Sequence, residues 1–84
     1  MTTAREEEAN WSSLLIAKLK TMSDEELLAR TLLAIRLFKR DRRNDRLYDE
    51  ANYCGYECRQ PGRREGLWKE AYSLWLDECK RGVN

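Results

Sequence analysis

Histidine is absent from the chain, and one proline and four glycines are the only residues that strongly interrupt regular structure. Histidine is the usual general base near neutral pH and a common metal ligand, so its absence argues against acid–base catalysis. A glycine-rich phosphate loop is also missing. Paired carboxylates occur, but the first turns and exposed faces of helices account for them. We therefore expect no enzymatic activity and no cofactor.

Aliphatic side chains are scarce as well, since Leu, Ile, Val and Phe supply only 16 of the 84 residues. So low a content would indicate disorder if the net charge were large, but the formal net charge is +1. Three Trp and four Tyr restore part of the missing apolar area, because each ring can bury roughly 150–250 Å². The sequence thus predicts one small domain over residues 1–84, which a partner or a second copy would help to stabilise.

Long apolar runs are missing too. No stretch approaches the ~20 apolar residues that cross a bilayer, and the polar, acidic N-terminal stretch is unlike a secretion signal. Three cysteines are an odd number, which fits a reducing compartment better than a disulfide framework. We expect a soluble cytoplasmic protein without a membrane partner.

The clearest predicted helix follows Ser23 and runs through Phe38. Ser23 and Glu26 form a capping box at its start, and acidic residues fill the first turn, where the helix dipole is positive. Its apolar side chains cover more than one face, so this helix needs neighbours on more than one side and is expected at the centre of the fold. They are Leu27, Leu28, Thr31, Leu32, Leu33, Ala34, Ile35, Leu37 and Phe38.

Two further helical segments flank this central helix, and no strand pattern competes with them. The first covers residues 4–20 behind a Thr3–Glu6 capping box, and its tight link to the central helix predicts antiparallel neighbours. The other covers residues 46–58. A break at Asn44-Asp45 separates it from the central helix, and we favour this break over one long helix that reaches about Tyr56.

The last predicted helix covers residues 63–80, after a firm stop at Pro61 and Gly62. Leu67 and Leu74 lie on the side of this helix away from its main apolar stripe. That stripe consists of Trp68, Ala71, Tyr72, Trp75 and Cys79. Together the segments predict an all-α fold, a compact bundle of three to four helices.

Three cysteines form the first candidate site. Cys54 and Cys58 are four residues apart and share a helical face, and Cys79 lies on the stripe of the last helix. We interpret all three as small buried side chains that hold two helices together, and we expect no metal. Two alternatives stay open: a zinc site, which would need a carboxylate as its fourth ligand, and a functional disulfide.

A basic block is followed directly by an acidic one in the middle of the chain: residues 39–46 carry a net charge of +3, and residues 47–58 carry −3. If the basic block were helical, four of its bases would share a face that can neutralise phosphates, and three later arginines would extend that face. The four are Lys39, Arg42, Arg43 and Arg46, and the later three are Arg59, Arg63 and Arg64. However, adjacent patches of opposite charge suit a protein partner or self-association better than a uniform polyanion.

Tyr53 and Tyr56 face away from Cys54 and Cys58 and are predicted to lie at an interface, because Tyr, Trp and Arg are enriched in binding hot spots. The leading functional prediction is a small non-enzymatic protein-binding module: a regulator, adaptor or inhibitor, of the kind that mobile elements carry. Nucleic-acid binding through residues 39–46 is the alternative, and a structural homodimer is the third prediction. The candidate binding residues are Lys39, Arg40, Arg42, Arg43, Arg46, Asp49, Glu50, Tyr53 and Tyr56.

Overall fold

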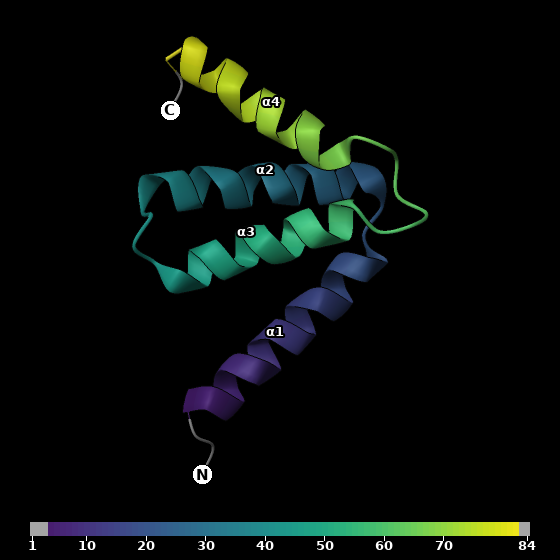
Figure 1. The fold of residues 1–84 in the computed structure, drawn as a ribbon, viewed down its shortest axis with the longest axis vertical. Helices are drawn as coiled ribbons and strands as arrows, with labels where there is room; N and C mark the ends of the chain where they lie inside the picture. The colour runs from purple at the N-terminus through teal and green to yellow at the C-terminus, as the bar shows by residue number, and fades with distance from the viewer. Residues whose placement is uncertain (1–3, 83–84) are drawn as a thin grey trace.

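Four helices account for most of the chain. In a computed structural model, which describes the backbone of residues 4–82 and the side chains of residues 10–82, they are α1 (Ala4–Thr21), α2 (Asp24–Arg40), α3 (Asp45–Cys58) and α4 (Leu67–Lys80) (Figure 1). No strand occurs between residues 4 and 82. The predicted all-α class and the predicted bundle of three to four helices are confirmed.

The central helix is α2, which lies between α3 and α4 and contacts both (Figure 1). Its first turn forms as predicted: the Ser23 hydroxyl accepts the Glu26 N–H at 3.2 Å, and the Glu26 carboxylate accepts the Ser23 N–H at 3.1 Å. Hydrogen bonding to Ser23, first of all the bond that the Ser23 N–H donates to the carboxylate, lowers the pKa of Glu26. Four residues of α2 are buried against its neighbours, namely Leu27, Thr31, Ala34 and Ile35.

The boundary between α2 and α3 lies where the sequence predicts a break. α2 ends at Arg40, and α3 begins at Asp45. Asn44 caps α3, because its side-chain oxygen accepts the Leu47 N–H at 3.2 Å. The alternative of one continuous helix is therefore excluded.

The start of the last helix was predicted wrongly. α4 begins at Leu67 rather than at Arg63, since residues 59–66 form a loop that ends at Gly66 with φ of +79°. This left-handed conformation favours glycine and is not helical, so it fixes the boundary. Leu67 also differs from expectation, because it has no exposed surface and belongs to the core instead of facing away from it.

Helix α1 packs chiefly against α3. Leu15 and Leu19 are buried, and the Tyr53 hydroxyl donates to the Ser12 hydroxyl at 3.2 Å across the α1–α3 contact. The chain reverses direction between α1 and α2, as predicted for a tight link, but the prediction that the two helices are packed neighbours is wrong (Figure 1). They diverge from the turn that joins them, and α1 packs against α3 instead. The predicted Thr3–Glu6 capping box lies outside the side chains that the structure describes.

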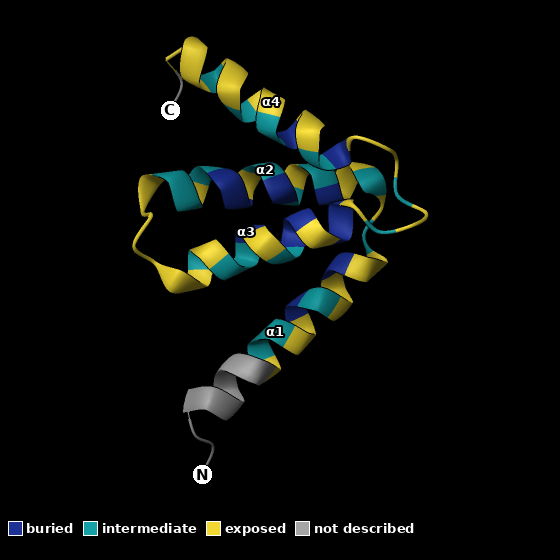
Figure 2. Cartoon of the chain, in the orientation of Figure 1, coloured by how far each residue is buried: buried dark blue, intermediate teal, exposed yellow. Residues whose placement is uncertain are grey.

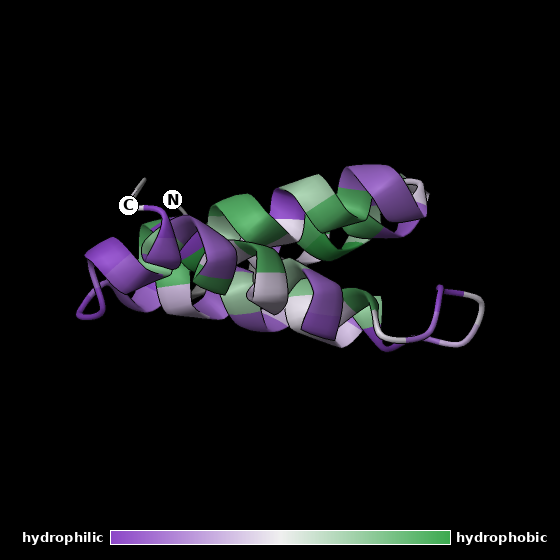
Figure 3. Cartoon of the chain, turned by 90° about the horizontal axis from the view of Figure 1, so that it is seen from above, coloured by the Kyte–Doolittle hydropathy of each residue, from purple (hydrophilic) through white to green (hydrophobic). Residues whose placement is uncertain are grey.

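The bundle is flat, and its buried residues lie mainly at one end. Its Cα extents are 47 × 32 × 14 Å, and the shortest is about the thickness of two packed helices (Figure 3). Buried residues gather toward the end where the helices meet, beside the α1–α2 turn and the 59–66 loop, whereas the far half of α4 is mostly exposed (Figure 2). The turn at residues 41–44 protrudes at the opposite end and is hydrophilic (Figure 3).

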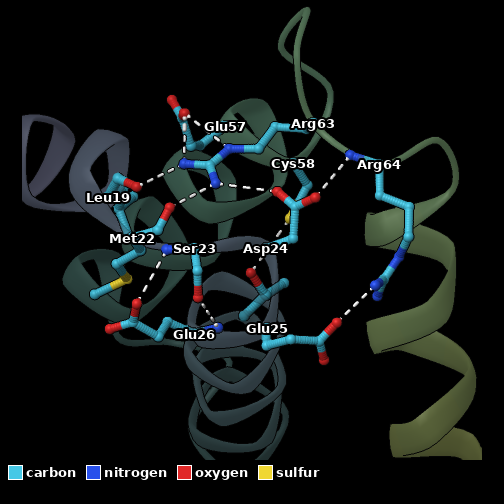
Figure 4. A network of polar contacts seen from close by, with 11 residues as sticks. Leu19, Met22, Ser23, Asp24, Glu25, Glu26, Glu57, Cys58, Arg63 and Arg64 are labelled. Carbon is cyan, nitrogen blue, oxygen red and sulfur yellow. Dashed lines mark hydrogen bonds and ion pairs between the residues drawn. The ribbon is translucent and has the colours of Figure 1, made fainter.

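Arg63 joins four segments at the well-buried end (Figure 4). Its guanidinium donates to the backbone carbonyls of Leu19 at 2.9 Å and Met22 at 2.6 Å, at the end of α1. It also donates to Asp24 in the first turn of α2, at 3.2 Å, and to Glu57 near the end of α3, at 3.1 and 3.3 Å. All five guanidinium N–H groups therefore have an acceptor, and the cation lies at the carbonyl end of α1, where the helix dipole is negative.

The neighbouring Arg64 makes ion pairs of a different kind. It pairs with Glu25 at 2.6 Å and with Glu70 at 2.8 Å, but its side chain is 42% exposed and those of its partners are 72% and 47% exposed. The Arg63 and Glu57 side chains are only 10% and 8% exposed. Water therefore screens the pairs of Arg64 and has little access to the Arg63–Glu57 pair.

We expect Arg63→Ala to lower the free energy of unfolding by about 3–5 kcal/mol, because it leaves the buried Glu57 carboxylate without its counter-ion. Arg64→Ala, the matched control, should cost much less, because water screens its ion pairs. Arg63→Lys should be intermediate, since an ammonium keeps the charge but lacks the planar fork that bridges the helices. Urea unfolding followed by circular dichroism measures all three. Equal shifts of the midpoint in the two alanine variants would contradict this account.

Acid should weaken the same corner of the fold. The hydrogen bond from Arg63 is the main cause that lowers the pKa of Asp24 below its ordinary 3.8, and Ser23 lowers the pKa of Glu26 below 4.5. Both carboxylates therefore stabilise the folded state above these ordinary values, and their contribution is lost as the pH falls through the lowered values, below about pH 4. Urea midpoints measured from neutral pH to about pH 3 should fall, and Asp24→Asn should show a smaller fall. An identical pH dependence in the variant would show that Asp24 does not contribute.

Candidate functional site

The turn between α2 and α3 divides the basic block of residues 39–46. Arg40 ends α2, and Arg42 and Arg43 lie in the turn; all three are exposed, as expected for binding residues. Because the helix is interrupted here, the bases do not share one helical face, and the phosphate-binding face that a continuous helix would have formed does not exist.

The two outer bases of the block contact aromatic rings. The Lys39 ammonium lies 5.7 Å from the centre of the Tyr72 ring and 5.2 Å from that of Trp75, both on α4. The Arg46 guanidinium lies 4.4 Å from the Trp11 ring on α1. Such cation–π contacts contribute about 0.5–1 kcal/mol each where water is near. Lys39 and Arg46 thus help to hold neighbouring helices.

Two of the three acidic residues in the acidic block form ion pairs within the fold. Glu50 forms an ion pair with Arg30 between α3 and α2, and Glu57 pairs with Arg63. Asp49 is half-buried and has no ion pair with a described residue. The predicted acidic patch beside the basic one is therefore much smaller than the sequence suggests.

The two tyrosines predicted at an interface have different surroundings. Tyr53 is half-buried between α1 and α3, with its ring 6.2 Å from that of Trp11, so it supports the fold. Tyr56 is 67% exposed. Of this pair, Tyr56 alone is freely accessible at the surface.

The three later arginines do not extend the basic turn. Arg59, Arg63 and Arg64 follow the far end of α3, and the 14 residues of that helix separate the two sites by about 20 Å. Arg63 and Arg64 are moreover engaged in the ion pairs described above.

An aromatic groove lies between α3 and α4, and sequence reasoning missed it. The α3–α4 groove has a volume of 160 Å³. It is lined by Ile35, Phe38 and Lys39 from α2, by Tyr48, Ala51 and Asn52 from α3, and by Trp68 and Tyr72 from α4. The signal available in the sequence was the presence of Tyr, Trp and Lys residues in three predicted helices. These residues can be recognised as one surface only when the positions of the helices are known.

A second hollow of 460 Å³, here called the loop hollow, adjoins this groove through Trp68, which lines both. Residues 58–60 and 63–69 line it, with Arg59 and Lys69 among them. Arg59 places its guanidinium 5.6 Å from the Trp68 ring. Trp68 can lie this close to α3 because residue 55 is glycine: a Cβ there would be 3.2 Å from the ring. Gly55 therefore permits the arrangement.

The cysteines do not form one cluster. Cys54 and Cys58 are buried beside Thr31, whose hydroxyl lies 3.4 Å from the Cys58 sulfur. Cys79 is exposed near the end of α4, so the expectation that it is buried with the other two is wrong. Among the described residues, no group of three or more cysteine, aspartate or glutamate side chains is arranged to hold a metal ion.

Comparison with protein-family models, with curated proteins and with solved structures finds no match to this chain. None of the helices within residues 4–82 is long and apolar enough to cross a bilayer. Function has to be inferred from the surface geometry alone.

The thiols provide a test of the packing. Burial raises the pKa of Cys54 to about 12 and also raises that of Cys58, so neither forms much thiolate near neutral pH. A thiol reagent should therefore label one cysteine quickly in the native protein and all three in denaturant. Cys79→Ser should remove the fast phase. Two fast thiols in the native protein would contradict the burial of Cys54 and Cys58.

Proposed function

We propose that this chain is a small non-enzymatic protein-binding module, a regulator, adaptor or inhibitor, whose binding face is the α3–α4 groove. The observation that carries the proposal is that α3 and α4 each contact α2 extensively but contact each other little. Aromatic side chains line the space that this leaves. Trp and Tyr are the residues most enriched in binding hot spots.

The exposure of these rings supports the proposal. Tyr48 is 51% exposed although its ring packs against that of Phe38 in a tilted arrangement, with ring centres 5.5 Å apart, and Trp68 and Tyr72 are half-buried. A chain with so few aliphatic residues leaves part of its large aromatic area uncovered by its own helices. A partner that covers the groove would bury that area.

Nucleic-acid binding has less support. Lys39 and Arg46 contact rings, and Arg63 and Arg64 are ion-paired, so four of the bases predicted to form a phosphate-binding surface are engaged within the fold. Arg40 ends α2, and Arg42 and Arg43 lie in the turn that follows, so these three exposed bases occupy one edge of the molecule. The formal net charge of +1 is also low for a nucleic-acid-binding domain.

Two matched substitutions on α3 test this proposal. Tyr48→Ala removes a ring from the groove, and Tyr56→Ala removes an exposed ring outside it. In affinity capture from nuclease-treated extract of the source cell, Tyr48→Ala should reduce the retained protein roughly tenfold or more, as loss of a hot-spot residue does. Tyr56→Ala should retain it. Loss with Tyr56→Ala alone would place the binding face on the other side of α3.

Labelled oligonucleotides of mixed sequence provide the opposing test. If the protein binds them with an affinity that falls steeply with salt, and Arg42→Glu with Arg43→Glu abolishes that binding, nucleic acid is the partner. The proposal predicts no such binding. If nucleic acid is the partner, Asp49→Lys should strengthen binding; Asp49 is the cleaner position because the neighbouring Glu50 is ion-paired with Arg30.

A further inference from the structure

We propose that α1 is a releasable cover of α3: it separates from α3 as a unit while α2, α3 and α4 stay packed together. Its release uncovers the side of α3 that carries Arg46 and Tyr53, both of which contact the Trp11 ring of α1. This inference goes beyond the proposed function, because no described side chain of α1 lines the α3–α4 groove.

A narrow interface attaches α1 to the rest of the molecule. α1 diverges from α2 beyond the turn that joins them, and α3 is the helix against which it chiefly packs (Figure 1). Among the side chains of residues 10–21, only Leu15 and Leu19 are buried. A helix of this length is marginally stable by itself in water, so α1 depends on this interface.

The other three helices are held together by contacts in which α1 takes no part. The Arg30–Glu50 ion pair joins α2 to α3, and the Arg36–Glu78 pair joins α2 to α4. Ten apolar residues in the described part of the chain are buried, and eight of them belong to α2, α3 and α4. These three helices therefore keep most of the core when α1 leaves.

Arg63 keeps its charged partners when α1 opens. Two of its acceptors are the backbone carbonyls of Leu19 and Met22 at the end of α1. Its carboxylate acceptors, Asp24 and Glu57, belong to α2 and α3. Release therefore exposes two neutral carbonyl groups, which water can bond, and leaves no buried charge unpaired. Complete unfolding separates the ion pairs as well, so release requires less free energy.

The link between α1 and α2 allows this separation without disturbing α2. Only Met22 and Ser23 lie between the two helices. Ser23 is extended, with φ of −67° and ψ of 166°, and its capping box with Glu26 is formed entirely on the α2 side of Met22. Rotation about the backbone of Met22 therefore moves α1 and leaves the first turn of α2 capped.

Native-state hydrogen exchange, followed for single amides by NMR, tests this inference. The amides of Leu15 and Leu19 should exchange roughly tenfold faster or more than the slowest amides of α2, after correction for intrinsic rates. Their exchange should also depend less on low concentrations of urea, since release exposes less surface than complete unfolding does. Equal protection and equal urea dependence in α1 and α2 would overturn the inference, because α1 would then leave only when the whole domain unfolds.

Two conservative substitutions give a sharper test. Ile35→Val removes a methylene group from a buried side chain of α2 that lines the groove, and Leu15→Val does so in the interface of α1. Ile35→Val should speed the slowest amides of α2 roughly three- to tenfold and leave those of α1 unchanged, since α2 stays packed during release. Leu15→Val should speed both, because it destabilises the closed state from which both openings start. Faster exchange of α1 in Ile35→Val would show one cooperative unit and would overturn the inference.

The same measurement separates release from fraying of the helix end. Release predicts equal protection of the Leu15 and Leu19 amides, whereas protection that rises steadily from Leu15 to Leu19 would show fraying, which also overturns the inference. Capture of a partner through the groove is measured separately with Tyr48→Ala, so either proposal can fail without the other.

Discussion

The arrangement of the bundle depends on one buried cation. Arg63 lies in a loop, yet it bonds carbonyl groups at the end of α1 and carboxylates at the start of α2 and near the end of α3. Because little water reaches it, each of these acceptors would lose a charge-assisted partner if the loop moved. The three largest fully buried side chains, Leu19, Leu27 and Leu67, lie near the end of α1, near the start of α2 and at the start of α4. The hydrophobic core and the polar network therefore lie at the same end of the molecule.

The opposite end of the bundle is more open. A layer only 14 Å thick between Cα atoms gives each helix few neighbours, so the large rings cannot be fully enclosed. Away from the Arg63 end, cations lying over rings connect the helices, as Lys39 does between α2 and α4. The Arg36–Glu78 and Arg30–Glu50 ion pairs connect α2 to its neighbours. An exposed aromatic groove is the consequence of this thinness, and it is the surface on which the proposed function rests.

The candidate site could be predicted only in part. The exposure of Arg42, Arg43 and Tyr56 followed from polar sequence and helical phase, and the break before Asp45 followed from the capping preference of Asn44. The positions of Tyr53 and Lys39 did not follow, because a half-buried tyrosine and an exposed one look alike in a sequence. Nothing in the chain near Lys39 indicates that its ammonium contacts rings more than thirty residues further on.

The sequence by itself determined the helical class, the capping box of α2, the break before α3, the central place of α2 and the lack of a histidine-based site. These features depend on residues within about four positions of each other, where helical geometry fixes which groups can meet. Only the tertiary structure decided that α1 packs on α3, that Cys79 is exposed, and that Arg63 bonds an acceptor 44 residues away. Such contacts depend on how whole helices are placed, and many placements satisfy the same local pattern. The groove between α3 and α4 belongs to this second class, since neither helix forms it alone.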